Sequence, residues 1–305
     1  EDSTFQVMGK GNASNFPGHG NGVGRTAGFK LDLAFDLLTG STLSQTFTHG
    51  THQDKSLGKY LLNQIKPGDL VVRDMGYFVT ESFKLIGEMS AFWLTRVPAN
   101  VAITLSNGSS LEKRLKPLSS NFIDEEVSVG TCGMRARLVA VRADKKTATQ
   151  RRRARNAQSK GRASSQALVR DGWHILLTNV SSDVTPKELF EIYALRWNIE
   201  TRFKAWKQSL NLSKVFKGVS NEDHYESLIL AALIQQLIGF NLAARISQLK
   251  NVVLSMEKLF EALSAHLSAL SQSTLSDPIR LRISHVSIEK RSRQPSHVQW
   301  LNLLS

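Results

Sequence analysis

Four polar side chains of types that bind metal ions or phosphate lie at helical spacing in the segment YALRWNIETRFKAWK. A phenol, a guanidinium, a carboxylate and an ammonium group stand at offsets of 0, 3, 7 and 14: Tyr193, Arg196, Glu200 and Lys207. At about 100° per residue, these offsets place all four within roughly 60° of arc on one helix, over about 21 Å. A carboxylate can bind a divalent cation, and the other three groups can bind phosphate. The segment therefore predicts one helix with a strip suited to phosphate chemistry.

A simpler interpretation of the same helix also exists, because apolar residues fall on an adjoining arc of about 80°. These apolar residues are Ile192, Leu195, Ile199, Phe203, Trp206 and Leu210. An amphipathic core helix with i,i+4 ion pairs, such as Arg196 with Glu200, would have this pattern. The choice depends on partner acids, because a catalytic magnesium ion needs several hard oxygen ligands and not one carboxylate alone.

Two aspartates at strand ends are the candidate partners of Glu200. The segment PGDLVVRDMGYF indicates a turn, an apolar strand over residues 70–72, and then Asp74 at the start of a Gly-containing loop. Ligands bind at the carboxyl ends of strands in open α/β sheets. Asp2 is the second candidate, in EDSTFQVMGK, where Phe5 and Val7 alternate with polar residues as on a half-buried strand. It is the weaker of the two, because only one residue precedes it.

Together, Asp2 in EDST, Asp74 in VVRDMGYF and Glu200 in RWNIE resemble the catalytic triad of the DDE transposases. The order Tyr, two residues, Arg, three residues, Glu, six residues, Lys is similar to the YREK motif of the insertion-sequence transposases that move by cut and paste. The resemblance extends from Asp2 to about Leu249. It implies that the three carboxylates are the catalytic residues and metal ligands of a DNA transposase.

The chemistry expected of such a site uses two ions of Mg²⁺ or Mn²⁺. Three carboxylates can hold two divalent ions about 3.5 to 4 Å apart, which activate a nucleophile and stabilise the leaving oxygen. In a transposase, water first cuts one strand at the transposon end, and the freed 3′-hydroxyl then attacks another phosphodiester. Tyr193, Arg196 and Lys207 are assigned to phosphate contacts, as a hydroxyl donor, a bidentate fork and a point charge.

The expected partners are double-stranded DNA, as transposon ends and target, and a second copy of the chain in a homodimer on the DNA. Two other functions stay open at this point. One is a hydrolytic nuclease of the same fold, and the other is a truncated or inactive transposase relic that only binds DNA.

The order of elements read from the sequence is that of a ribonuclease-H-like core, which the resemblance also implies. The fold class expected is α/β, with a mixed sheet flanked by helices, a β-rich insertion before the last catalytic helix, and a helical C-terminal tail. A hairpin over residues 29–49, a helix over 53–65, the strand before Asp74, a helix near 82–89 and a strand over 91–97 are predicted. In the hairpin, Asp32 and Asp36 are expected to face solvent.

In simple members of the fold class that the resemblance implies, the last two acids are only a few dozen residues apart, so the gap of 126 residues between Asp74 and Glu200 predicts an insertion. Its pieces VAITLS, FIDEEVSVG and MRARLVAVRAD are short and rich in β-branched residues, which favours a β-rich subdomain over residues 98–174. The catalytic core then comprises residues 1–97 and 175–220, with a helical C-terminal region over 221–305. A strand over 172–180 leads through Thr185 and Pro186, a typical N-cap and first-turn pair, into the catalytic helix.

The net charge of +13 is concentrated in the predicted insertion. In KKTATQRRRARNAQSKGR, residues 145–162, eight of eighteen residues are Lys or Arg and none is acidic. Such a block is typical of contact with a polyanion, because each neutralised phosphate releases counterions. A solvated disordered loop is the alternative. The residues expected to bind DNA here are Arg151, Arg152, Arg153 and Arg155.

Composition limits the remaining possibilities. At 305 residues and 41% hydrophobic, the chain can bury a sizeable core. The single cysteine, Cys132, excludes an internal disulfide framework and favours a reducing, cytoplasmic setting, as in a protein associated with the bacterial nucleoid. No apolar run reaches membrane-spanning length. The resemblance also implies an amino-terminal DNA-binding region, and no helix-turn-helix candidate precedes Asp2, so the chain is expected to be a fragment of a longer polypeptide or a decayed copy.

Overall fold

The computed structural model describes residues 1–8, 13–18, 26–38, 42–116, 121–209, 221–250 and 258–259. The chain divides into two compact units. The first comprises Glu1 and Gln53–Arg196, and the second comprises Asp2–His52 and Trp197–Ser305. Each unit has its own sheet and its own hydrophobic core.

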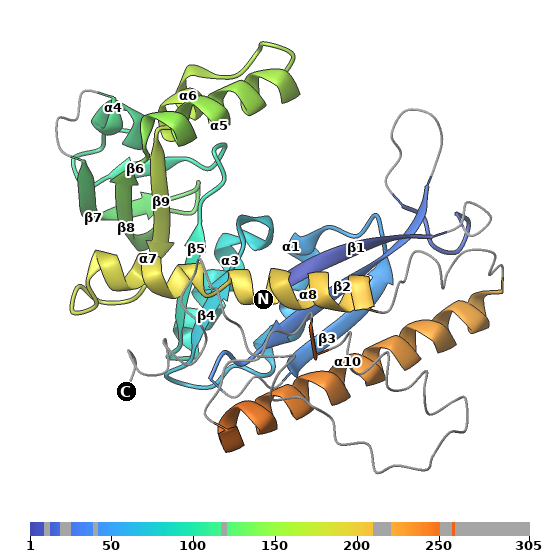
Figure 1. The fold of residues 1–305 in the computed structure, drawn as a ribbon. Coiled ribbons are helices and arrows are strands. Elements are labelled where there is room, and N and C mark those ends of the chain that lie inside the picture. Colours follow the sequence, from blue (N-terminus) through green and yellow to red (C-terminus); the bar gives the residue numbers. More distant parts are fainter. Residues whose placement is uncertain are drawn as a thin grey trace, which may run out of the picture. The chain divides into compact units, whose positions relative to one another are not determined.

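The second unit is built on a three-stranded antiparallel sheet in the order β1-β2-β3. Its strands are β1 (Asp2–Met8), β2 (Ala27–Phe35) and β3 (Thr42–His49). One face packs against α8 (Trp197–Ser209) and α10 (Glu222–Lys250), which lie along the sheet in Figure 1. The core between them includes Phe29, Leu31 and Leu33 from β2, Ile199 and Phe203 from α8, and Tyr225, Ile229 and Leu233 from α10.

The strand predicted at Asp2 is confirmed, but the expectation of which side is buried is wrong. Thr4, Gln6 and Met8 are buried, whereas Val7 is 55% exposed. The ring of Phe5 lies against the backbone on the other side of the sheet, since a Cβ on Gly28 would come within 2.3 Å of it. The missing side chains of Gly28 and Gly50 leave the room that the Phe5 ring occupies on this face.

The prediction that Asp32 faces solvent is also wrong. Asp32 lies in β2, the middle strand of the sheet, and its side chain is fully buried. Asp36 follows the end of the strand and is half-buried, and its carboxylate accepts a hydrogen bond from the backbone nitrogen of Leu38 at 2.7 Å. The alternation of apolar and polar residues along β2 does not reveal that both faces of this middle strand are covered by other parts of the protein.

The first unit has a six-stranded mixed sheet in the order β4-β5-β9-β8-β7-β6. Only β4 and β5 pair in parallel, and the other pairs are antiparallel. The strands are β4 (Leu70–Arg73), β5 (Phe92–Arg96), β6 (Ile103–Leu105), β7 (Phe122–Val129), β8 (Met134–Arg142) and β9 (Trp173–Thr178). The predicted order of three strands, a helix, a strand, a helix and a strand up to residue 97 is confirmed, except that the single helix predicted over residues 53–65 is two short helices, Asp54–Leu57 and Lys59–Leu62.

Helices precede, separate and follow the strands of this sheet along the chain. They are α1 (Asp54–Leu57), α2 (Lys59–Leu62), η2 (Met75–Tyr77), α3 (Thr80–Glu88), α4 (Leu111–Leu115), α5 (Lys145–Gln158), α6 (Ser165–Arg170) and α7 (Pro186–Ala194). In the part of the chain that the structure describes, no helix combines the length and apolarity needed to cross a membrane.

In its described residues, 98–116 and 121–174, the predicted insertion contains its three expected strands, β6, β7 and β8, but also three helices. The basic segment forms α5, so the alternative of a disordered loop does not hold. Asp144 caps this helix by accepting a hydrogen bond from the backbone nitrogen of Thr147 at 2.9 Å, and the residues that follow are mostly good helix formers. Because β8 pairs with β9, the insertion shares the six-stranded sheet. The domain boundaries at residues 97, 174 and 220 stay predictions.

The prediction that residues 193–207 form a single helix is wrong. α7 ends at Ala194 and α8 begins at Trp197. Between them, the backbone nitrogens of Leu195 and Arg196 bond to the carbonyls three residues earlier, which is a turn tighter than an α-helix. Of the predicted C-terminal helical region, α10 and residues 258–259 are helical, and the rest lies outside the described residues, as does Leu210.

The start of α7 has a complete capping box, as Thr185 and Pro186 predict. The Thr185 hydroxyl accepts from the backbone nitrogen of Glu188 at 3.3 Å, and the Glu188 carboxylate accepts from the backbone nitrogen of Thr185 at 2.7 Å. Both bonds satisfy backbone donors that the helix itself leaves unpaired.

We expect Thr185→Ala to lower the free energy of unfolding by about 1 kcal/mol, because it removes this N-cap. Urea denaturation measures the change. Ser182→Ala in the same loop is the matched control, because Ser182 is exposed. A Thr185→Ala protein as stable as the Ser182→Ala protein would show that the capping box contributes nothing.

Candidate active site

Asp74 lies where β4 ends, as the sequence predicts. Its carboxylate accepts a hydrogen bond from the backbone nitrogen of Gly76 at 3.4 Å and thereby caps η2. The Nε atom of Arg196 lies 3.9 Å from the Asp74 carboxylate, at the outer limit of an ion pair. The Asp74 side chain keeps 31% of its surface exposed, so its oxygens stay accessible to a ligand.

Tyr193 and Arg196 join Asp74 at this place in the first unit. The Arg196 guanidinium lies 5.8 Å from the centre of the Tyr193 ring. Burial raises the pKa of the Tyr193 phenol to about 12, against the opposing effect of the Arg196 charge. The phenol therefore stays protonated at neutral pH and can donate a hydrogen bond.

Arg96, at the end of β5, belongs to the same charged cluster, although the sequence analysis did not single it out. Its positive charge acts on Tyr193 and also on Arg151. Arg151 in turn donates to the backbone oxygen of Trp173 at 3.0 Å and lies 3.1 Å from Nδ1 of His174. Burial, and then the charges of Arg151 and Arg96, lower the pKa of His174. The available signal was the position of Arg96, one residue before the end of the strand predicted over residues 91–97.

The second unit contains the other two candidate ligands, Asp2 and Glu200. Asp2 pairs with Leu33 across the sheet, so it lies on the face that α8 covers. Glu200 lies in the first turn of α8, where the helix dipole favours a negative charge. Both side chains are half-buried.

Lys207 ties α8 to β1, since its ammonium group donates to the backbone oxygen of Phe5 at 2.6 Å. In Figure 1, α8 and β1 begin at the same end and run side by side. From that bond, Glu200 lies about 10.5 Å back along the helix and Asp2 about 10 Å back along the strand. The two carboxylates are thus at the same end of the unit. Burial lowers the pKa of Lys207, and its role in phosphate contact stays a prediction.

Among the described residues, no group of three or more His, Cys, Asp and Glu side chains is placed to hold a metal ion. The three predicted ligands are divided between the units, with Asp2 and Glu200 in one and Asp74 in the other. Their chemistry fits a hard divalent cation, because all three offer carboxylate oxygens and none is fully buried.

Three of the four arginines predicted to bind DNA are engaged within their own unit. Arg151 contacts Trp173 and His174, and Arg152 donates to the backbone oxygen of Leu168 at 3.1 Å. Arg155 forms a bidentate ion pair with Asp171, with distances of 2.7 and 2.6 Å. These bonds hold α5 against α6 and β9, and Figure 1 shows α5 and α6 side by side. Arg153 is exposed on α5 and makes no such bond among the described residues.

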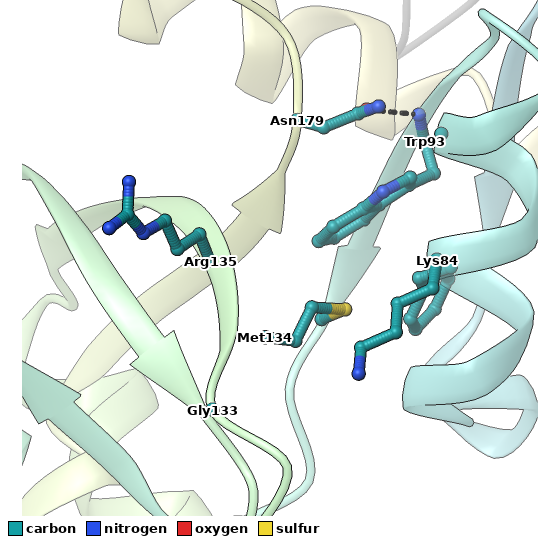
Figure 2. Close-up of a pocket in the computed structure, with 8 residues that line it drawn as sticks. Lys84, Trp93, Gly133, Met134, Arg135 and Asn179 are labelled. Atoms are coloured by element: carbon teal, nitrogen blue, oxygen red, sulfur yellow. Dashed lines mark hydrogen bonds between the residues drawn. The ribbon is translucent and has the colours of Figure 1, made fainter.

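A pocket of about 330 Å³ lies elsewhere in the first unit, between α3 and the start of β8. Figure 2 shows Lys84 and Arg135 at its sides and Trp93 and Asn179 above it. The Asn179 side chain is already bonded, accepting from the backbone nitrogen of Trp93 at 2.8 Å and donating to Ala91 at 3.0 Å. No predicted site residue lines this pocket, so we assign no part of the chemistry to it.

A family model described as the transposase DDE domain matches residues 2–233, about three quarters of the chain. The chain belongs to the transposase DDE domain family. The DDE domain match begins at Asp2 and contains Asp74 and Glu200. The expectation of a DDE insertion-sequence transposase is thereby confirmed at the level of the family, while the YREK assignment stays a prediction.

Curated relatives of this DDE domain are insertion-sequence transposases. The transposase for IS231B of Bacillus thuringiensis subsp. berliner is 27% identical over 299 residues, which cover 89% of this chain and 62% of the relative. The transposase for IS1151 of Clostridium perfringens is 25% identical over 298 residues, which cover 88% of this chain and 63% of the relative. The chain therefore spans less than two thirds of the length of these relatives.

Among solved structures, the piggyBac transposase synaptic complex with hairpin DNA is similar to this chain. The alignment covers 95% of this chain and 57% of the piggyBac transposase chain. The identity is 12% and the TM-score is 0.46, which is too low to assign a fold.

The buried environment of Tyr193 in the DDE domain predicts that its phenol ionises only at unusually high pH. The absorbance of wild type minus that of Tyr193→Phe should show phenolate formation with a midpoint near pH 12. Because the folded pKa lies above the unfolded value of about 10, the stability contributed by the neutral phenol is complete below pH 10 and is lost as the pH rises toward 12. Tyr60→Phe, at an exposed site, calibrates the amplitude of one phenol. A midpoint near pH 10 would mean that water reaches the Tyr193 hydroxyl.

Proposed function

We propose that the chain is the catalytic region of a DNA transposase, which cleaves DNA at transposon ends and joins the freed 3′ ends to target DNA. The observation that carries this proposal is the family match over residues 2–233, which includes all three candidate carboxylates. A ribonuclease-H-like core is part of the proposal. Its support is the order of elements up to β5 and the parallel pairing of β4 with β5.

Asp2, Asp74 and Glu200 are the proposed catalytic carboxylates, and they would hold two ions of Mg²⁺ or Mn²⁺. When bound, such ions lower the pKa of an attacking water and stabilise the negative charge on the leaving oxygen. The carboxylates supply hard oxygen ligands from three separate segments of the chain. The proposal requires that Asp74 joins Asp2 and Glu200 at one site.

Tyr193 and Arg196 are proposed to hold the DNA backbone beside Asp74. The Tyr193 hydroxyl is protonated at neutral pH but buried, so its donation to a phosphate oxygen requires that the surroundings of Tyr193 open when DNA binds. The Arg196 guanidinium lies at 3.9 Å from Asp74, a distance at which it can exchange this weak ion pair for a bidentate phosphate contact. Lys207 would add a positive charge about two helical turns beyond Glu200, from a position where it also ties α8 to β1.

Helix α5 is proposed to contact the DNA backbone without reading sequence. Arg153 and the exposed residues Lys145 and Lys146 supply charge to this surface. Arg151, Arg152 and Arg155 would contribute through the positive field of the helix while holding it in place. A dimer on the DNA stays part of the proposal.

Removing any one of the three carboxylates tests the catalytic site. We expect Asp2→Asn, Asp74→Asn and Glu200→Gln each to slow strand cleavage by about 1000-fold or more, because several kcal/mol of charge stabilisation are lost. The substrate is a supercoiled plasmid that carries the gene with its natural flanking DNA, in Mg²⁺ or Mn²⁺. Glu191→Gln is the matched control, since Glu191 lies on α7 and pairs only loosely with Lys187 at 3.9 Å.

The same assay separates the alternatives. Wild-type cleavage with joined products supports a transposase, and cleavage without joined products supports a hydrolytic nuclease. DNA binding without cleavage by the wild type supports an inactive relic. Equal cleavage by wild type and Glu200→Gln would overturn the site.

Substitutions on α5 test the proposed DNA surface. Arg153→Gln should weaken duplex binding and reduce the slope of log affinity against log salt by about 1, because one phosphate contact is lost. Fluorescence anisotropy over a range of salt concentrations measures both changes. Arg155→Gln is the comparison, and it should mainly lower the thermal midpoint, because it leaves the buried carboxylate of Asp171 without its partner. An unchanged salt slope in Arg153→Gln would remove Arg153 from the DNA surface.

A further inference from the structure

Arg73, the last residue of β4, is a cation without any exposed surface. Its Nη1 atom donates to the hydroxyl of Ser82 at 2.7 Å, and Nη2 donates to the backbone oxygen of Gly58 at 2.7 Å. Its Nε atom forms an ion pair with the Glu1 carboxylate at 2.5 Å. One guanidinium therefore joins three segments of the first unit.

Glu1 is held to β4 twice. Its side chain is fully buried in the ion pair with Arg73, and its backbone nitrogen donates to the backbone oxygen of Val72 at 2.9 Å. A buried ion pair is a poor source of stability, because the cost of removing two charges from water offsets most of their attraction. A geometric role explains this pair better than a gain in stability does.

The position of the pair in the sequence points to that role. Glu1 immediately precedes Asp2, and Arg73 immediately precedes Asp74. We propose that Arg73 is a positioning residue for Asp74, an inference that rests on the proposed function of Asp74 as a metal ligand. Through its bonds to Glu1, Ser82 and Gly58, Arg73 fixes the end of β4 that carries Asp74, without contact to metal or DNA.

The direction of the side chains agrees with this role. Adjacent residues in extended backbone point to opposite sides, and Asp74 has extended dihedral angles. Because Arg73 is buried among Gly58, Ser82 and Glu1, the next residue, Asp74, points away from the interior. The Asp74 side chain is therefore partly exposed to solvent. The bonds set the orientation of Asp74 while leaving its oxygens accessible.

Only arginine can make all three contacts. The planar guanidinium presents donors in several fixed directions, whereas a lysine has a single ammonium group. Gly58 supplies the space, because a Cβ at that position would lie 3.3 Å from Nη1 of Arg73, a tight contact.

Direct measurement of Mn²⁺ binding by calorimetry, with the full chain and no DNA, tests the role. Arg73→Lys and Glu1→Gln should each weaken Mn²⁺ binding by about 10-fold, as changes to groups that orient metal ligands do. Glu1→Gln keeps the shape of the side chain, so it carries the test if Arg73→Lys does not fold.

Arg170 and Glu112 form the matched control, a buried ion pair in the same unit with an N–O distance of 2.5 Å. Arg170→Lys and Glu112→Gln should lower the thermal midpoint but leave Mn²⁺ affinity at the wild-type value. An equal loss of affinity in this control pair, or wild-type affinity in Glu1→Gln, would overturn the inference.

Asp74→Asn separates this inference from the proposed function. Wild-type Mn²⁺ binding in Asp74→Asn would overturn both. Loss of binding in Asp74→Asn together with wild-type binding in Glu1→Gln and Arg73→Lys would overturn the role of Arg73 alone.

Discussion

One stretch of chain, residues 186–209, has to serve two hydrophobic cores, and the placement of the candidate site residues depends on it. On α7, Leu189 packs into the core of the first unit, with Val72 and Leu176. On α8, Ile199 and Phe203 pack into the core of the second. A straight α-helix would keep its apolar residues on one continuous face, but these two segments belong to different cores. The two-residue turn at Leu195 and Arg196 separates them, and it also divides the polar motif into two pairs.

Local sequence signals predicted the turn after β4 and the start of α7, because each of these features depends on only a few neighbouring residues. The turn after β4 and the cap at Thr185 needed only the chemistry of aspartate, glycine, threonine and proline at given positions. The buried face of β1 could not be predicted in this way. Phe5 favoured one face by its own hydrophobicity, but its place depends on the missing side chain of Gly28 on the neighbouring strand. Burial of Asp32 likewise depends on both neighbours of β2.

The charge block over residues 145–162 shows a related limit. Counting charges predicts a polyanion partner, but the count does not distinguish a cation available to a ligand from one already bonded to its own chain. Arg155 holds the carboxylate of Asp171, and Arg152 holds the carbonyl of Leu168, so both help to fix the helix. Arg153, between them in the sequence, projects from the exposed side. Helical periodicity, once the segment is known to be a helix, separates the structural arginines from those that can contact DNA.

A metal site needs carboxylates that are fixed in place and yet have accessible oxygens, and these two demands conflict for any single residue. At the proposed site, neighbouring residues would divide these two demands between them. Each candidate ligand is partly exposed and directly follows a residue whose side chain is at most 1% exposed: Asp2 follows Glu1, Asp74 follows Arg73, and Glu200 follows Ile199. Two of these anchors are the halves of one ion pair, and the third is part of a hydrophobic core. Rigidity therefore comes from the preceding residue and reactivity from the ligand, which explains how half-exposed side chains can have fixed positions.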